Sequence, residues 1–88
     1  MLRFGTTGLF DKDLDLMEKR GKDIGKLERV LQSLICEEAL SYQLRDHPLK
    51  GNWKGHRELH MEPDWLLIYK KTDKEIIAVR TGTHSDLF

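Results

Sequence analysis

In the first half of the chain, apolar residues recur at helical spacing behind a short apolar start. The opening segment MLRF is typical of a strand, and the following GTTG offers Thr6 or Thr7 as the cap of a helix. One apolar face of that helix is formed by Leu9, Phe10, Leu14 and Met17. After a break at RGKD, a second helix has its apolar face at Ile24, Leu27, Val30, Leu31, Leu34 and Ile35. Two short helices joined this closely predict an antiparallel helical hairpin.

The second half changes to the period of strands. Residues 53–61 alternate, so that His60 faces the side opposite to Leu59 and Met61. Residues 65–71 are apolar enough for a central strand, and residues 75–84 form the last one. Short turns at EPD and TDKE predict an antiparallel meander. We therefore expect one α+β domain over residues 1–88, with an N-terminal strand and a helical hairpin packed on a small antiparallel sheet.

Composition limits the classes of protein that fit. The chain has 88 residues with 15 basic and 15 acidic side chains, which predicts one small domain without a global field for nucleic acid. No apolar run reaches the ~20 residues that span a bilayer, and the N-terminus lacks the pattern of a secretion signal. The single cysteine, Cys36, cannot form an internal disulfide. We expect a cytoplasmic protein with no membrane partner.

Basic residues nevertheless gather in one segment. Residues 45–57 contain one acidic residue, Asp46, and four basic ones: Arg45, Lys50, Lys54 and Arg57. Such a stripe is usually solvated surface, but it is also the segment best suited to meet phosphates. Lys50 and Lys54 are therefore candidate substrate-binding residues.

Three of the four histidines fall within residues 46–65. Strand alternation and short turns can bring His60, Asp64 and Arg80 near one another. His84 follows the last strand, and His47 can fold over the rim. Cleavage of RNA by its own 2′-hydroxyl needs a base for the hydroxyl proton, an acid for the 5′-oxygen and a cation for the phosphorane charge. These residue types supply that set, although from the residues alone a polar surface without chemistry is the alternative.

The histidine spacing does not predict a metal site. His56 and His60 are four residues apart, which on a strand is roughly 13 Å and too far for one zinc ion. The chain also lacks a closely spaced pair of cysteine ligands. We expect neither a metal nor another cofactor.

The same residues carry a resemblance to a known family. Residues 46–70, DHPLKGNWKGHRELHMEPDWLLIYK, and the terminal RTGTHSDLF are similar in order and spacing to the YafQ branch of the RelE/ParE superfamily of bacterial toxins. The resemblance implies a RelE-like microbial RNase fold and an endoribonuclease, an mRNA interferase that cuts messenger RNA on the ribosome without a metal. It also implies contacts with ribosomal RNA and a cognate antitoxin. Operator DNA would be bound only by the toxin–antitoxin complex.

The positions of the family motif are all present. They are His47, His60, Asp64, Trp65, Arg80, His84 and Phe88. We expect His84 to act as general acid and His60 or Asp64 as base. A non-nuclease toxin of the same fold, either a gyrase poison or an inactive relative, is the alternative function.

The remaining motif residues are expected to bind substrate. His47 and Arg80 would hold the scissile phosphate, while Trp65 and Phe88 would stack on bases or shape the pocket. Three neighbouring positions are given structural interpretations. Trp53 should anchor its loop, and Arg57 and Glu58 should form a surface ion pair of little energetic weight.

Overall fold

The computed structural model describes residues 1–88 and contains one five-stranded sheet. The strands are β1 (Arg3–Thr6), β2 (His47–Pro48), β3 (Arg57–Glu62), β4 (Trp65–Lys71) and β5 (Glu75–Gly82). Their order across the sheet is β1-β5-β4-β3-β2. The meander of β3, β4 and β5 is antiparallel, which confirms the prediction from the strand pattern. The two-residue strand β2 extends the sheet beside β3.

The predicted α+β fold is confirmed, and the sheet differs from the expected one in two details. β1 runs parallel to β5, with Phe4 opposite Ile76, so the sheet is mixed rather than antiparallel. Both helices and the meander separate these strands in the sequence, and such a long connection can return the chain in the same direction. Residues 53–56 do not belong to a strand but to a loop with a 3-10 turn, η2 (Gly51–Trp53). Gly51 and Gly55 have φ angles of 66° and 89° there, which glycine adopts without strain.

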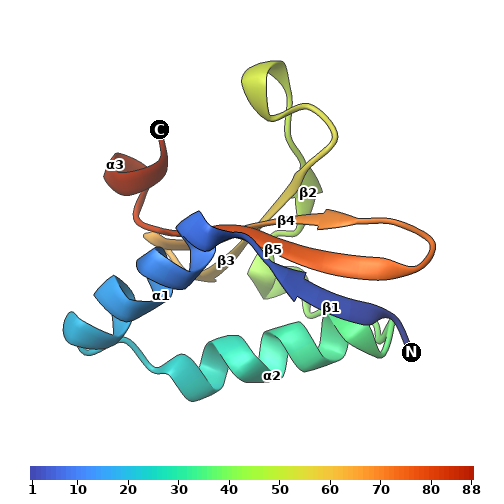
Figure 1. The fold of residues 1–88 in the computed structure, drawn as a ribbon, viewed down its shortest axis with the longest axis horizontal. Coiled ribbons are helices and arrows are strands. Elements are labelled where there is room, and N and C mark those ends of the chain that lie inside the picture. Colours follow the sequence, from blue (N-terminus) through green and yellow to red (C-terminus); the bar gives the residue numbers. More distant parts are fainter.

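Two helices cover one face of the sheet (Figure 1). α1 (Gly8–Lys19) begins at Thr7, whose hydroxyl accepts a hydrogen bond from a first-turn amide. α2 (Ile24–Ile35) begins at Asp23 in the same way. The predicted helices are confirmed, although they diverge from the turn that joins them and pack mainly on the sheet (Figure 1). Neither is long and apolar enough to cross a membrane.

The main core lies between these helices and the sheet. Alternation along β4 sends Trp65, Leu67 and Tyr69 into this core and sends Leu66 and Ile68 to the opposite face. On that opposite face a second, smaller apolar cluster forms with the short helix α3 (His84–Leu87) and the loop around η2. Figure 1 shows α3 and this loop standing on the side of the sheet away from α1 and α2.

Candidate active site

Three of the four histidines meet on the face opposite the helices. His47 lies in β2 opposite Glu58 in β3, and His60 follows two residues later on the same side of β3. His84, the first residue of α3, approaches from the C-terminal end. The ring centroids of His47 and His60 are 6.2 Å apart, and those of His60 and His84 are 5.7 Å apart. The three imidazoles therefore form a row with His60 in the middle, and we call them the histidine row.

A buried carboxylate, Glu58, lies against this row and was missed by the sequence interpretation. Its Oε1 is 3.0 Å from His60 Nε2 and 3.7 Å from His47 Nε2. The expected surface pair with Arg57 is wrong, because adjacent residues of a strand point to opposite faces. Arg57 instead bonds Asp46 on the helix side. The available signal was that Glu58 shares the alternation of His60.

Asp64, in the turn between β3 and β4, fixes the orientation of His84. The Nδ1–H of His84 donates to Asp64 Oδ1 at 2.6 Å, and the backbone N–H of His84 donates to the same oxygen at 2.9 Å. These hydrogen bonds, first the backbone and then the imidazole one, lower the pKa of Asp64 below its usual value. Asp64 therefore stays ionised near neutral pH and leaves Nε2 of His84 free toward solvent.

A cavity of about 430 Å³ opens beside the histidine row. It is lined by Gln43, Arg45, His60, Met61, Glu62, Pro63 and His84. Arg45 therefore flanks the same cavity as two of the histidines, and sequence reasoning placed it only in a basic stripe. Its backbone carbonyl also accepts the Nδ1–H of His47 at 2.7 Å. Arg45 is the second residue that the sequence interpretation missed.

Arg80 lies elsewhere than expected. Its Nε donates to Asp13 Oδ2 at 2.6 Å and its Nη2 donates to Asp13 Oδ1 at 3.1 Å. This carboxylate of α1 raises the pKa of Arg80. In the sheet register Arg80 lies opposite Ile68, and Ile68 lies opposite Glu58, so a whole strand separates Arg80 from the carboxylate of the row. The expected place of Arg80 beside His60 is therefore wrong.

Trp65 also differs from its expected role. Its side chain is fully buried in the main core, and its Nε1–H donates to the Thr81 hydroxyl at 3.0 Å. The Thr81 hydroxyl in turn donates a hydrogen bond to the backbone carbonyl of Leu66. A ring without exposed surface cannot stack on a base, so of the two expected roles stacking is wrong, and a part in shaping the pocket stays a prediction.

Aromatic and basic residues rim the site on the loop side. Phe88 is 60% exposed and lies edge-on to Trp53, with 6.3 Å between the ring centroids. Trp53 packs on the smaller apolar cluster, which confirms its role as an anchor of the loop. Lys50 and Lys54 are exposed at either end of η2. The side chains of Phe88 and both lysines are thus accessible to a bound RNA strand.

The centre of the site also has the geometry of a metal-ligand group. Glu58, His60 and His84 each offer one ligand atom, and these atoms all lie within 4.8 Å of one another. The sequence interpretation tested only His56 with His60, and therefore missed this group. Asp64 stands behind His84 as an outer carboxylate, an arrangement that orients many metal-binding imidazoles.

Comparisons with known proteins agree with this architecture. Residues 2–88 match the family model described as bacterial toxin of type II toxin-antitoxin system, YafQ. The mRNA interferase toxin YafQ of Escherichia coli K12 is 49% identical over 83 residues, which cover 93% of this chain and 90% of the relative. The crystal structure of the E. coli DinJ-YafQ complex superposes with a TM-score of 0.93 at 46% identity, over 100% of this chain and 99% of that one. A metal-bound toxin from Helicobacter pylori gives 0.93 at 42% identity, with both chains fully covered.

Fold and site together define a bacterial toxin of a type II toxin–antitoxin system. Within that class the chain belongs to the YafQ family, whose curated E. coli member is an mRNA interferase and thus an endoribonuclease. The resemblance that the motifs indicated is therefore confirmed along nearly the whole chain.

Proposed function

We propose that this chain halts translation by cutting messenger RNA on the ribosome, through metal-independent acid–base catalysis. The observation that carries the proposal is the histidine row, with one carboxylate behind His60 and another behind His84, beside an open cavity. Acid–base chemistry at neutral pH needs groups that titrate there, and imidazole is the side chain that does. The name of the E. coli relative, an mRNA interferase, supports the same substrate.

The proposed reaction uses two histidines in opposite roles. His60 takes the proton of the 2′-hydroxyl, whose oxygen attacks the adjacent phosphorus. The bond from phosphorus to the 5′-oxygen breaks as His84 Nε2 donates a proton to that oxygen, leaving a 2′,3′-cyclic phosphate and a 5′-hydroxyl. The ionised Asp64 orients His84 through the hydrogen bond to its Nδ1. Because the hydrogen bonds from His84 lower the pKa of Asp64, its carboxylate is a weak base, and His60 is the better of the two candidates.

Glu58 and His47 complete this arrangement. The carboxylate of Glu58 can only accept, so it favours the proton on His60 Nε2 and leaves Nδ1 to act as base. His47 stands at the far end of the row from His84, where it can hold a phosphate oxygen. Lys50, Lys54 and Phe88 contact the messenger RNA and the ribosomal RNA around it.

We also propose a cognate antitoxin as the partner of this chain in the cytoplasm. The E. coli toxin has been crystallised in complex with DinJ, and the close superposition on that complex supports an equivalent partner here. Operator DNA would be bound by the toxin–antitoxin complex rather than by the free toxin. No cofactor enters the reaction.

A cleavage map of a translated messenger in a cell-free system tests the nuclease. We expect codon-phased cuts whose downstream fragments carry 5′-hydroxyl ends, and no cuts when translation is blocked before elongation. Cleavage should be unchanged after the toxin has been dialysed against a chelator. An intact messenger would favour a gyrase-directed or inactive toxin, and supercoiling by gyrase is the measurement that separates those two.

A second activity is favoured by one specific observation. The ligand atoms of Glu58, His60 and His84 have the spacing of a transition-metal site, and we propose that a borderline ion such as Zn²⁺ or Cu²⁺ binds there as an inhibitor. It would occupy both imidazoles that the reaction needs. Titration calorimetry with Zn²⁺ on Cys36→Ser protein should show one site that Glu58→Gln weakens at least tenfold and His56→Gln leaves unchanged. Equal binding by all variants would contradict it.

A further inference from the structure

The site as described lacks a cation for the scissile phosphate, because Arg80 is held by Asp13. The chain has six arginines, and four of them pair with carboxylates. The other two are Arg3 and Arg45. Arg3 lies in β1, at the opposite edge of the sheet from the histidine row. Arg45 is therefore the arginine without a carboxylate partner that lies near the row.

Arg45 is also exposed and lies at the cavity beside the histidine row. It lines the cavity of about 430 Å³ together with His60 and His84, the proposed base and acid. Its carbonyl oxygen holds His47 through the Nδ1–H. Arg45 thus contacts the histidine row through its backbone and lines the cavity beside that row.

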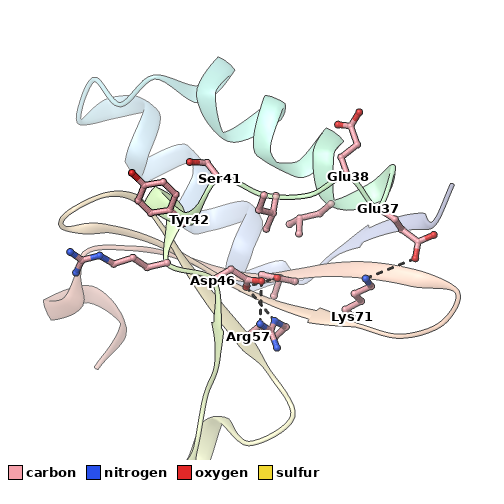
Figure 2. Close-up of a pocket in the computed structure, with 11 residues that line it drawn as sticks. Glu37, Glu38, Ser41, Tyr42, Asp46, Arg57 and Lys71 are labelled. Atoms are coloured by element: carbon pink, nitrogen blue, oxygen red, sulfur yellow. Dashed lines mark hydrogen bonds and ion pairs between the residues drawn. The ribbon is translucent and has the colours of Figure 1, made fainter.

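The backbone at Arg45 has a conformation that a functional position explains. Its φ of 52° and ψ of 44° are left-handed, which is uncommon for any residue other than glycine, asparagine or aspartate. Both sides are fixed: the N–H of Arg45 donates to the Tyr42 carbonyl, and the next residue, Asp46, bonds Arg57 and Tyr69. Figure 2 shows Asp46 and Arg57 joined by these bonds in the lining of a second cavity, which Arg45 lines as well. Such over-determined outliers concentrate at active sites.

We propose that Arg45 is a catalytic residue, and that its guanidinium binds the scissile phosphate and stabilises the phosphorane charge. This inference rests on the proposed nuclease function. A guanidinium suits the task because its planar fork can hold two phosphate oxygens at once and stays charged at every working pH. It takes no proton in the reaction, so the proton balance between His60 and His84 is unchanged.

The test uses Arg45→Gly, since glycine adopts the left-handed conformation without strain and removes only the side chain. Single-turnover cleavage of messenger on programmed ribosomes should slow by about 10²–10³-fold, the usual loss when one transition-state donor is removed. Binding to ribosomes should change far less, and the unfolding midpoint should stay equal or rise. Arg45→Lys should recover part of the rate, because an ammonium keeps the charge without the fork.

Two further variants make the result decisive. Arg29→Ala removes an exposed arginine of α2 and should cut at the parent rate. If Arg45→Gly also cuts at the parent rate, Arg45 is not the cation, and a loss in Arg80→Ala alone would return that role to Arg80. If the parent itself cuts no messenger under any condition, the proposed function fails and this inference fails with it.

Discussion

The two faces of the sheet are formed by the same strands but differ in how far they bury their side chains. The helix-covered face buries large apolar side chains, and each polar group within it has a partner: the Trp65 indole bonds Thr81, and the Tyr69 hydroxyl bonds Asp46 at 2.6 Å. The opposite face has only a small apolar cluster, and two of its histidines, His60 and His84, line the open cavity. Glu58 is the one buried group among the histidine row and its two carboxylates.

This difference shows how a chain of 88 residues separates stability from chemistry. Alternation along β3 gives each face every second residue, so that one strand supplies both core and site. The main core can then hold the sheet rigid while the other face keeps histidines accessible. Substitutions on the helix-covered face should therefore lower stability most. Substitutions on the opposite face should lower activity with little effect on stability.

The largest effect on stability should come from the core face. Trp65→Ala should lower the free energy of unfolding by about 3–5 kcal/mol, since it removes a large buried ring and leaves a cavity. Urea denaturation followed by circular dichroism measures it. Phe88→Ala, on the exposed rim, should stay within about 0.5 kcal/mol of the parent. Similar losses of unfolding free energy in both variants would mean that stability does not depend mainly on the helix-covered face.

A smaller effect on the core face should depend on pH. Burial, and after it the hydrogen bond to Asp46, raises the pKa of Tyr69 above the usual value near 10. The folded state therefore keeps the phenol protonated while the unfolded chain ionises it above pH ~10. This contribution to stability is complete below pH ~10 and declines above it by about 1.4 kcal/mol per pH unit.

The comparison with Tyr69→Phe isolates that contribution. At neutral pH the variant should lose about 1 kcal/mol, the net worth of the hydrogen bond to Asp46. Between pH 9 and pH 11 the difference from the parent should shrink, because phenylalanine has no proton to lose. Unfolding free energies of both proteins across this range measure it. A constant difference would show that Tyr69 ionises normally in the folded protein.

The smallest effect on stability should come from an ion pair that holds α3. Arg20, the C-terminal cap of α1, donates to Asp86 at 2.7 Å, and Asp86 also accepts the N–H of Thr83, the N-terminal cap of α3. Arg20→Ala should lower the free energy of unfolding only slightly, since the pair is partly exposed and screened by solvent. Cleavage should nevertheless slow several-fold, because a four-residue helix bearing His84 loses its tether.

Arg29→Ala is the control for that variant, because Arg29 is also an arginine paired with an aspartate. Arg29 pairs with Asp23 at 3.8 Å on α2, away from the site. Its removal should change neither stability nor cleavage. Equal cleavage by Arg20→Ala and the parent would show that α3 keeps its place without the ion pair.

Sequence patterns could predict much of this division and failed at identifiable points. Alternation placed His60 opposite the core, and the motifs brought His47 and His84 to it. Alternation and short turns predicted Arg80 near His60, whereas a register shift between β4 and β5 places Arg80 opposite Ile68, two strands away from β3. Local patterns do not contain such a shift.

Partners distant in sequence explain the other misses. Asp13, which binds Arg80, is 67 residues away, and nothing near either residue indicates the pair. Glu58 seemed a surface residue because its sequence neighbour is basic, although its face was predictable. Trp65 began an apolar strand, and only the motif directed attention to it as a binding residue. Pairings between distant elements decide these cases, and a single sequence does not state them.

The most direct test of the central claim measures two quantities on the same proteins, His60→Ala and His84→Ala. The claim is that the histidine row performs chemistry and contributes little to the fold. We predict that single-turnover cleavage on ribosomes falls by about 10²–10⁴-fold in each variant, the usual contribution of a general acid or base. The free energy of unfolding should stay within about 1 kcal/mol of the parent. Full cleavage by both variants, or loss of activity only in step with unfolding, would contradict the claim.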